Sequence, residues 1–600
     1  MGWAKSLVRQ VWPILITSAQ ALSSSSWAGF AKNDITLLGP VYQPSSNLSA
    51  RAWSSARQEA SGGFNQMIET GLASSGVFDN MTTSFSASVF SVESDSPLFE
   101  FHFEAPGLNG SLNAGKLSEN TIYRTGSLGK LLVAYTWLVN IGHLVWFDPI
   151  TKYIHELAEA AEDFHNPLLQ TNWSEVTIGS LMSQLSGLGR DYSLGDYSVA
   201  PYTAEQAAAM GFPPLANGSS IECSALGPMG LPGCRRDELL QGIINHPPSF
   251  RSFHTPFYSN IGFEILGLAY ENITGNPIAQ DHDHLYRDRL GMKSTSYSAP
   301  GADADTIIPM NDTYAQFSYS LAAESPTART GNQYTSTKDL RTLGQAILKS
   351  TLLPPVLTRQ WLKPATATGQ TNMMVGAPWE IVRYQVPVNN IINANRTVDV
   401  YCKSGDYGKY SSLFCLAPDY NIGLSVLLAG EGASMERFDV GGILIDNFLP
   451  AAEAAAKESA RTAFPGTFRA PDRNSSVTLA VDGGPGVAIT SWTSNGTDLL
   501  VSPALAGVTG QNDDFRLYPT GLSYRPESDE LTYHKYHLIA VPAEGKFVPG
   551  WFAITNHQWL VSEVADYDNL AVDAVVVGID AEGLVQTFEC QALRSTYFRV

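Results

Sequence analysis

The chain has 600 residues, 44% of them hydrophobic, so it is long enough to bury large cores and to form about two to four domains. Its formal net charge is −20, which disfavours binding to nucleic acids and to anionic membrane surfaces. We therefore expect neither a nucleic-acid partner nor a stable membrane anchor. No Cys/His cluster has metal-ligand spacing, so we also expect no metal and no cofactor.

The first residues have the pattern of a secretory signal peptide. Lys5 and Arg9 precede the apolar run 11–16, and the small-residue triplet Ala19–Ala21 follows it. Neither this run nor any later one reaches the ~20 apolar residues that span a bilayer. We therefore predict that residues 1–21 are a cleaved signal peptide and that the mature protein is secreted.

The sequons and cysteines agree with passage through an oxidising secretory pathway. Cys223 and Cys234 flank a Gly/Pro-rich loop, and Cys402 and Cys415 flank a predicted hairpin, so we expect two local disulfides; unpaired buried thiols are the alternative. Cys590 is left over. The ten Asn-x-Ser/Thr sequons are Asn47, Asn80, Asn109, Asn172, Asn217, Asn272, Asn311, Asn395, Asn474 and Asn495.

In chain order, hydrophobic periodicity predicts helices with intervening strands. Helices are predicted at Ala52–Leu72, Leu131–Phe164, Ser180–Leu188, Gly262–Tyr270, Thr337–Ser350 and Met435–Phe448. Strands are predicted at Phe85–Val92, Phe99–Phe103, Thr397–Cys402, Ser411–Ala417 and Gly423–Ala429. Between these elements, the Pro- and Gly-rich stretch Tyr192–Pro248 is predicted to be a loop-rich insertion that covers the candidate active site described below.

The end of the chain has a different character. The Ala/Glu/Lys segment Ala451–Ala463 reads as a linker or a helix end. Beyond it, short β-like runs alternate with turn residues, which predicts a separate all-β domain. Its clearest runs are Ser476–Val481, Val487–Trp492 and Leu499–Val501.

A Ser-x-x-Lys pair lies at the start of the helical run that follows residue 125. Ser127 and Lys130 are three residues apart, so on a helix the lysine amine reaches back to the serine hydroxyl. A buried lysine has a lowered pKa and can activate a serine nucleophile. Alone, however, such a pair is more often an ordinary helix start with a snorkelling lysine.

Two further motifs support a catalytic role for this pair. Tyr258-Ser259-Asn260 lies where a loop enters a helix, and Lys403-Ser404-Gly405 lies at the end of a predicted strand. A second Tyr-x-Asn, at Tyr567, lies late in the chain and out of order. The order nucleophile with lysine, Tyr-x-Asn, Lys-Ser/Thr-Gly resembles serine β-lactamases and penicillin-binding peptidases, and the tyrosine form resembles class C β-lactamases and related esterases.

The resemblance covers about residues 80–450 and includes fungal secreted relatives with a β-rich C-terminal extension. It implies that Ser127 is the acylated nucleophile, Lys130 its proton partner and Tyr258 the general base or a proton shuttle. Asn260 would orient Lys130 and the substrate carbonyl, and Lys403 would supply positive charge. Two lysine cations beside the Tyr258 phenol agree with these roles, because a phenol loses its proton near neutral pH only if nearby positive charge stabilises the phenolate.

The resemblance further implies an oxyanion hole made by the backbone N–H groups of Ser127 and Asp406, beside Ser404 and Gly405 of the strand motif. One residue departs from the pattern. Asp406 stands where class C enzymes often carry Ser, so we expect poor reception of a β-lactam carboxylate. The Ser-Asp-Asn motif of class A is absent from the sequence.

We therefore expect an α+β protein with the β-lactamase/transpeptidase-like fold, an antiparallel sheet flanked by helices plus a helical subdomain, followed by a smaller all-β domain. The boundaries would be 1–21, 22–463 and 464–600. The expected function is a secreted serine hydrolase acting on an ester, lactone or amide, with a small-molecule acyl substrate. Acyl transfer to another acceptor and a catalytically silent scaffold are the alternatives, and the C-terminal domain is a candidate surface for oligomer formation.

Overall fold

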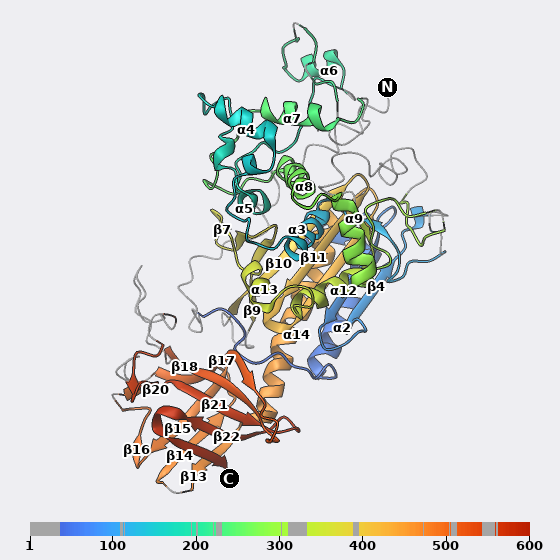
Figure 1. The fold of residues 1–600 in the computed structure, drawn as a ribbon. Helices are drawn as coiled ribbons and strands as arrows, with labels where there is room; N and C mark the ends of the chain where they lie inside the picture. Colours follow the sequence, from blue (N-terminus) through green and yellow to red (C-terminus); the bar gives the residue numbers. More distant parts are fainter. Residues whose placement is uncertain are drawn as a thin grey trace.

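A computed structural model describes residues 37–600 except 109–111, 113–114, 194, 200–201, 216, 220, 224–230, 302, 310–332, 388–394, 472, 503, 506–512, 543–558 and 560–561. The predicted signal peptide, the sequons Asn109 and Asn311, and the side chain of Asn395 lie outside the described residues. The fold has two parts, a larger part of helices and sheet and a smaller β part, and the long helix α14 (Ala433–Ala463) runs from one to the other (Figure 1).

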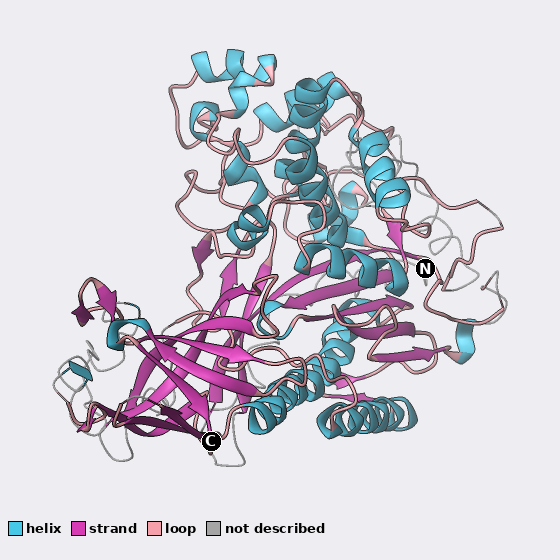
Figure 2. Ribbon diagram, turned by 60° about the horizontal axis from the view of Figure 1, so that its bottom comes forward, coloured by secondary structure: helices cyan, strands magenta, loops and turns pink. Residues whose placement is uncertain are grey.

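The larger part is built around an eight-stranded sheet whose neighbouring strands are all antiparallel. In spatial order its strands are β4 (Phe99–Phe103), β3 (Ser84–Ser91), β12 (Ile422–Ala429), β11 (Tyr410–Ala417), β10 (Asn395–Tyr407), β9 (Glu380–Pro387), β8 (Met373–Val375) and β7 (Thr366–Ala367). Helices cover both faces (Figure 2). This arrangement confirms the predicted α+β fold.

Strand β3 shows why the sheet is covered on both sides. All its residues are buried; Phe90 joins the buried cluster on one side of the sheet, whereas Phe85, Ala87 and Val89 alternate with serines. Because side chains alternate between the faces of a strand, these three residues lie on one face. There they join a buried cluster with α2 (Arg51–Thr70) and α14, in which the Phe64 and Phe85 rings lie 5.4 Å apart.

The remaining helices lie on the opposite side of the sheet, and some of them form a helical region that extends away from it (Figure 1). Trp137 of α3 and Tyr270 of α8 belong to the large buried cluster on this side, with ring centroids 5.6 Å apart. The helices are α3 (Gly129–Asn140), α4 (His155–Glu162), α5 (Ile178–Met182), α6 (Ala204–Ala209), α7 (Arg236–Ile244), α8 (Asn260–Thr274), α9 (Ile278–Asp283), a π-helix (His284–Arg289), α12 (Thr337–Leu348) and α13 (Pro355–Trp361). Short strand pairs are β1 (Leu72–Ala73) with β2 (Gly76–Val77) and β5 (Tyr123–Arg124) with β6 (Tyr334–Thr335).

Two predicted helices are shorter than the sequence suggested. The apolar run Leu131–Phe164 is not one helical region, because the chain leaves α3 after Asn140 and Gly142 adopts the left-handed conformation at φ 80°. The predicted helix Ser180–Leu188 ends as α5 at Met182, and Gln184 follows it with a φ of 61°. In both places apolar residues continue past the helix end and mimic its periodicity.

The segment 451–463 is helical, so the prediction that it could be a linker is wrong. It continues α14 without interruption, even though Pro450 lies inside the helix. The first part of α14 packs on the sheet through Val440 and Leu444, and its last turns contribute Ala456 and Ala460 to the core of the β part. The helix therefore joins the two cores directly.

The β part is a closed barrel. Its sheet has the order β14-β13-β23-β22-β21-β18-β17-β15-β16, and β14 also pairs with β15, which closes the ring. Its interior is filled by side chains, with the Trp492 and Phe588 rings 5.6 Å apart. The strands are β13 (Gly466–Ala470), β14 (Ser475–Ala480), β15 (Val487–Ser494), β16 (Thr497–Asp498), β17 (Asp513–Tyr524), β18 (Thr532–Pro542), β21 (Ala574–Ile579), β22 (Val585–Cys590) and β23 (Ser595–Arg599), and β19 (Asp566–Tyr567) pairs with β20 (Leu570–Ala571) beside them. The predicted strand Leu499–Val501 is wrong, since β16 ends at Asp498.

A segment near the start of the described chain ties the barrel to the larger part. Tyr42 is buried in the barrel core, and its hydroxyl donates to the carbonyls of Gly484 and Gly486, each at 3.1 Å. The carbonyl of Gly39 accepts hydrogen bonds from the Arg396 guanidinium at 3.0 Å and from the Tyr518 hydroxyl at 3.0 Å. The barrel therefore shares its core and its polar contacts with residues outside 464–600.

The four cysteines that were expected to pair are joined in the structure as Cys223–Cys234 and Cys402–Cys415, whereas Cys590 is a buried free thiol. The second disulfide joins register partners of β10 and β11. Among the helices of the described residues, none is both long and apolar enough to cross a membrane.

Candidate active site

Ser127 lies in a tight 3-10 turn, Gly126–Leu128, that leads into α3. Of residues 121–130, all of which are described, it alone is not buried. Lys130 lies in the first turn of α3, is fully buried, and its Nζ donates to Ser127 Oγ at 3.0 Å. The Ser-x-x-Lys spacing therefore produces the direct contact that was expected from helix geometry.

Tyr258 approaches the same hydroxyl from another element. Its OH donates to Ser127 Oγ at 2.6 Å, and it lies two residues before the start of α8. Ser259 is the N-cap of that helix, and its Oγ accepts the Gly262 N–H at 3.0 Å, which fixes the entry of the chain into α8. Ser127 Oγ thus has an amine on one side and a phenol on the other.

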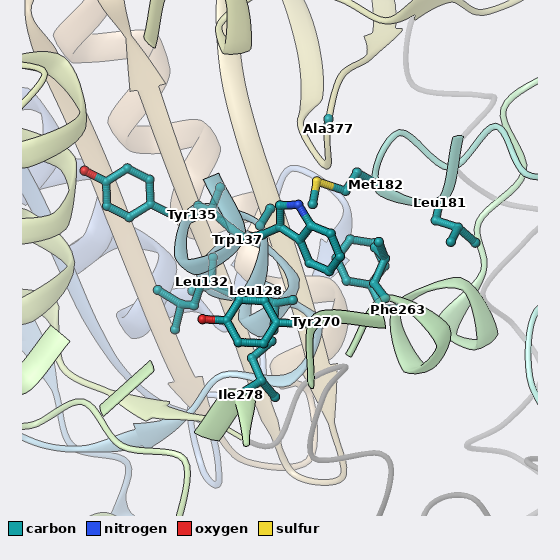
Figure 3. Packing of buried hydrophobic residues seen from close by; sticks show 14 of the residues in the cluster. Leu128, Leu132, Tyr135, Trp137, Leu181, Met182, Phe263, Tyr270, Ile278 and Ala377 are labelled. Atoms are coloured by element: carbon teal, nitrogen blue, oxygen red, sulfur yellow. The ribbon is translucent and has the colours of Figure 1, made fainter. Parts of the chain in front are cut away.

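A rigid core holds these two elements. Figure 3 shows Trp137 of α3 lying beside Phe263 and Tyr270 of α8, with Met182 of α5 adjacent. All of these side chains are buried. Since α3 carries Lys130 and α8 begins beside Tyr258, packing between the two helices sets the distance between the phenol and the serine.

Two lysines surround the Tyr258 ring. Lys130 Nζ lies 5.1 Å and Lys403 Nζ 5.5 Å from its centroid. Burial raises the pKa of Tyr258, but Lys130 and Lys403 together lower it by more, so the pKa lies below its ordinary 10.0. Burial lowers the pKa of Lys130; the neighbouring Tyr258 opposes this shift and Lys403 adds to it. The phenol is thereby prepared to act as a base, and its titration is coupled to that of the amine.

Lys403 is held in place by a residue that the sequence did not suggest. Its Nζ lies 2.5 Å from Oε1 of Glu380 on β9 and 2.7 Å from the carbonyl of Ser404, and Oε2 of Glu380 accepts the Ser404 N–H at 2.9 Å. Lys403 is only 1% exposed. Glu380 is opposite Cys402 in the β9–β10 register, so only strand pairing brings it here.

The strand motif and the Ser127 turn touch through their backbones. A Cβ added to Gly405 would lie 2.1 Å from the Thr125 carbonyl oxygen and 2.8 Å from the Ser127 nitrogen, and a Cβ on Gly126 (φ 55°) would lie 2.6 Å from the Asp406 nitrogen. Only glycine permits this approach. The turn that carries Ser127 therefore packs directly on β10 at Gly405 and Asp406, and the oxyanion hole expected from the Ser127 and Asp406 amides stays a prediction.

The Asp406 side chain is tied to α14. Its Oδ1 accepts from Ser411 Oγ at 3.0 Å and forms an ion pair with Arg437 of that helix. Arg437 also donates to Ser411 Oγ at 2.9 Å. The negative charge that departs from the family pattern is therefore compensated within the fold.

Asn260 is held by a carboxylate that sequence reasoning missed. Its Nδ2 donates to Asp191 Oδ1 at 2.6 Å, and Asp191 Oδ2 pairs with Arg190 Nε at 3.3 Å. The Arg190 guanidinium lies 4.8 Å from the Tyr258 ring centroid and adds a third cation to this ring. Burial raises the pKa of Asp191, although Asn260, Arg190 and Lys130 oppose that shift. Tyr567, the second Tyr-x-Asn tyrosine, lies apart on the β19–β20 hairpin.

Within the part of the chain that the structure describes, no group of three or more His, Cys, Asp or Glu side chains is arranged to hold a metal ion. The polar groups at Ser127 are instead a phenol, two amines and backbone amides. Such a set can remove a proton from a hydroxyl and stabilise an oxyanion, which are the requirements of nucleophilic acyl transfer.

Comparisons with known proteins agree with this chemistry. A family model described as "Beta-lactamase" matches residues 99–442, and one described as "Beta-lactamase-like-like, C-terminal domain" matches residues 456–600. The "Beta-lactamase-like protein" of Arthroderma benhamiae is 29% identical over 558 residues, which cover 86% of this chain and 88% of that protein. "Probable hydrolase M10" of a Phoma species is 26% identical, with 80% of each chain covered.

Among solved structures, the D-stereospecific amidohydrolase from a Streptomyces species superposes with a TM-score of 0.43 at 18% identity, covering 64% of this chain and 98% of its own. The family match alone spans more than half of the chain and includes Ser127, Tyr258 and Lys403. This chain belongs to the β-lactamase family, as a β-lactamase-like hydrolase with an additional C-terminal β domain.

Proposed function

We propose that this protein is a serine hydrolase that forms an acyl-enzyme on Ser127 and acts on an ester, lactone or amide. The observation that carries the proposal is the double contact of Ser127 Oγ, 3.0 Å from Lys130 Nζ and 2.6 Å from the Tyr258 hydroxyl. Folding alone does not require two buried groups of lowered pKa beside one half-buried serine. The arrangement therefore favours a catalytic role for Ser127.

In the proposed reaction, Tyr258 as phenolate takes the Ser127 proton while Oγ attacks the substrate carbonyl. The tetrahedral oxyanion accepts hydrogen bonds from the Ser127 and Asp406 amides, and Lys130 and Lys403 stabilise the charge on the tyrosine. Tyr258 then protonates the leaving group as the carbonyl re-forms and leaves Ser127 acylated. A water molecule repeats the sequence in the second half and releases the acid.

The test is steady-state hydrolysis of a panel of activated esters, lactones and amides. Ser127→Ala should abolish turnover of every substrate that the wild type accepts, whereas Ser55→Ala, at an exposed position on α2, should leave it unchanged. Equal turnover by Ser127→Ala would remove Ser127 from the mechanism. Adding a small alcohol and measuring ester against acid products tests acyl transfer, because both outcomes share the acyl-enzyme.

We further propose that the mature protein is secreted and glycosylated. Two disulfides are typical of an oxidising compartment. Sequon asparagines that are exposed are Asn47, Asn217, Asn272, Asn474 and Asn495, whereas Asn80 and Asn172 are half-buried. Expression in a eukaryotic secretory host should release a protein that begins at residue 22 and loses mass on glycosidase treatment. Retention inside the cell with an intact N-terminus would contradict this.

A further inference from the structure

A cavity of about 890 Å³ lies in the insertion between α5 and α8, next to the Ser127 site. It is lined by described residues from the stretches 191–198 and 212–221, by α6, and by the end of α7 with residues 245–247. Its volume is in the range of pockets that bury drug-sized ligands. The mechanism proposed above uses none of the described lining residues, although Asp191 accepts a hydrogen bond from Asn260 of the candidate site.

Aromatic and apolar side chains form much of its lining. Tyr197 and Phe212 both line the cavity, and their rings stack with centroids 5.1 Å apart and planes 24° apart. Phe212 and Leu215 are 47% and 54% exposed, so they are not sealed in a core. Large apolar side chains left accessible around a concave surface indicate that the surface binds an apolar partner.

The cavity shares a wall with the active site. Asp191 lines the cavity and also accepts the Asn260 amide at 2.6 Å. Arg190 stacks on the Tyr258 ring. His246 lines the cavity and packs so tightly on Gly189 that an added Cβ there would lie 2.4 Å from its ring. Chain 189–191 therefore contacts a cavity-lining residue at Gly189, lines the cavity at Asp191, and reaches Tyr258 and Asn260 through the side chains of Arg190 and Asp191.

We propose that this cavity binds a neutral aromatic ring system of the ester substrate. The stacked Tyr197–Phe212 pair supplies flat faces for it. The described lining residues include the carboxylates of Asp191 and Asp196 and neither Lys nor Arg, which disfavours an anionic ligand. The inference rests on the proposed function for its link to turnover, and the ring can belong to the acyl or the alcohol part of the ester.

The test compares three esters. Vinyl acetate has no naphthyl ring, vinyl 2-naphthoate carries the ring in its acyl group, and 2-naphthyl acetate carries it in its alcohol group. Wild type should show a higher kcat/KM for one of the naphthyl esters than for vinyl acetate. Ala207→Trp fills the cavity from α6 and should lower that kcat/KM by about tenfold or more, with vinyl acetate within about twofold. The matched control is Ala208→Trp, at an exposed position one residue along α6 outside the cavity lining, and it should change neither.

Binding of 2-naphthol to Ser127→Ala, measured by calorimetry, separates the pocket from the chemistry. We expect binding that Ala207→Trp abolishes and Ala208→Trp preserves in that background. If no ester is turned over but this binding pattern holds, the proposed function fails and the pocket stands. If esters are turned over while Ala207→Trp and Ala208→Trp behave alike with both naphthyl esters and with 2-naphthol, the pocket is refuted and the proposed function stands.

Discussion

The ammonium of Lys403 lies 2.5 Å from Oε1 of Glu380 in a buried setting beside Tyr258. Burial raises the pKa of Glu380, but Lys403 and the Ser404 amide lower it by more, so it lies below the ordinary 4.5. A carboxylate whose pKa is depressed on folding stabilises the fold above its unfolded pKa. The contribution of this pair is therefore complete above about pH 5 and is lost as the pH falls through the folded-state pKa.

Glu380→Gln should lower the free energy of unfolding at pH 7 by about 3 kcal/mol, because it leaves the buried Lys403 ammonium without its counter-ion. Denaturant unfolding at pH 7 and near pH 3 measures this, and the difference from wild type should shrink at the lower pH. The double variant Glu380→Gln/Lys403→Met should lose less than the sum of the two single changes. Additive losses would show that the two residues are not coupled.

Tyr258→Phe should lower kcat on an activated ester by about a hundredfold or more, because it removes the proton-transfer group and nothing else. Since the pKa of Tyr258 is depressed and the phenolate is the active form in the proposed mechanism, wild-type activity should rise from acid pH and level off below pH 10. The variant should lose that rise. The control is Tyr567→Phe, at the exposed tyrosine of the other Tyr-x-Asn.

Near-wild-type kcat and an unchanged pH profile in Tyr258→Phe would assign the base to Lys130 alone. The profile should show no dependence on chelators, since the groups at Ser127 are a phenol, two amines and backbone amides. Added metal ions are likewise expected to change nothing. These measurements need no knowledge of the natural substrate.

Gly405→Ala should separate β10 from the Ser127 turn, because its Cβ would lie 2.1 Å from the Thr125 carbonyl oxygen. We expect kcat/KM to fall by about a hundredfold, as for a misplacement of ~1 Å at the reacting groups. Gly442→Ala is the control: nothing lies within 4 Å of its added Cβ on α14, and an alanine there should stabilise the helix by ~0.5–1 kcal/mol. Full activity of Gly405→Ala would argue against an oxyanion hole at this contact.

Tyr42→Ala should lower the free energy of unfolding by about 3–5 kcal/mol, because Tyr42 fills the barrel core and hydrogen-bonds to its loops. Tyr524→Ala, at an exposed barrel position, should cost little. Thermal unfolding and acylation kinetics check both variants. The rate of Ser127 acylation in folded Tyr42→Ala should match wild type, and a slowed rate at unchanged stability would show that the barrel acts on the site.

The proposed catalytic residues could be predicted from the sequence because each motif is local. Ser127 and Lys130 are joined by one turn of helix, and the Tyr258 and Lys403 motifs each keep a fixed spacing. The role of Glu380 could not be predicted from the sequence, because Glu380 reaches Lys403 only through the register of β9 and β10. Asp191 was missed for the same reason: its contact with Asn260 joins a loop to a helix start 69 residues later.

Element boundaries failed where backbone conformation overrode hydrophobic pattern. Gly142 and Gln184 turn the chain into the left-handed region while apolar residues continue. Pro450 lies inside α14, yet the helix continues because the sheet and barrel cores hold both of its halves. Closure of the barrel depends on the pairing of β14 with β15, and short alternating runs alone do not specify it.

The most direct test of the account is intact-mass analysis and peptide mapping after brief exposure to a fluorophosphonate. We predict a single adduct on Ser127 in the wild type and none in Ser127→Ala. Lys130→Met should form the adduct much more slowly, because Ser127 Oγ loses the amine that lies 3.0 Å away. An adduct on another residue, or one that persists in Ser127→Ala, would contradict the assignment of Ser127 as the nucleophile.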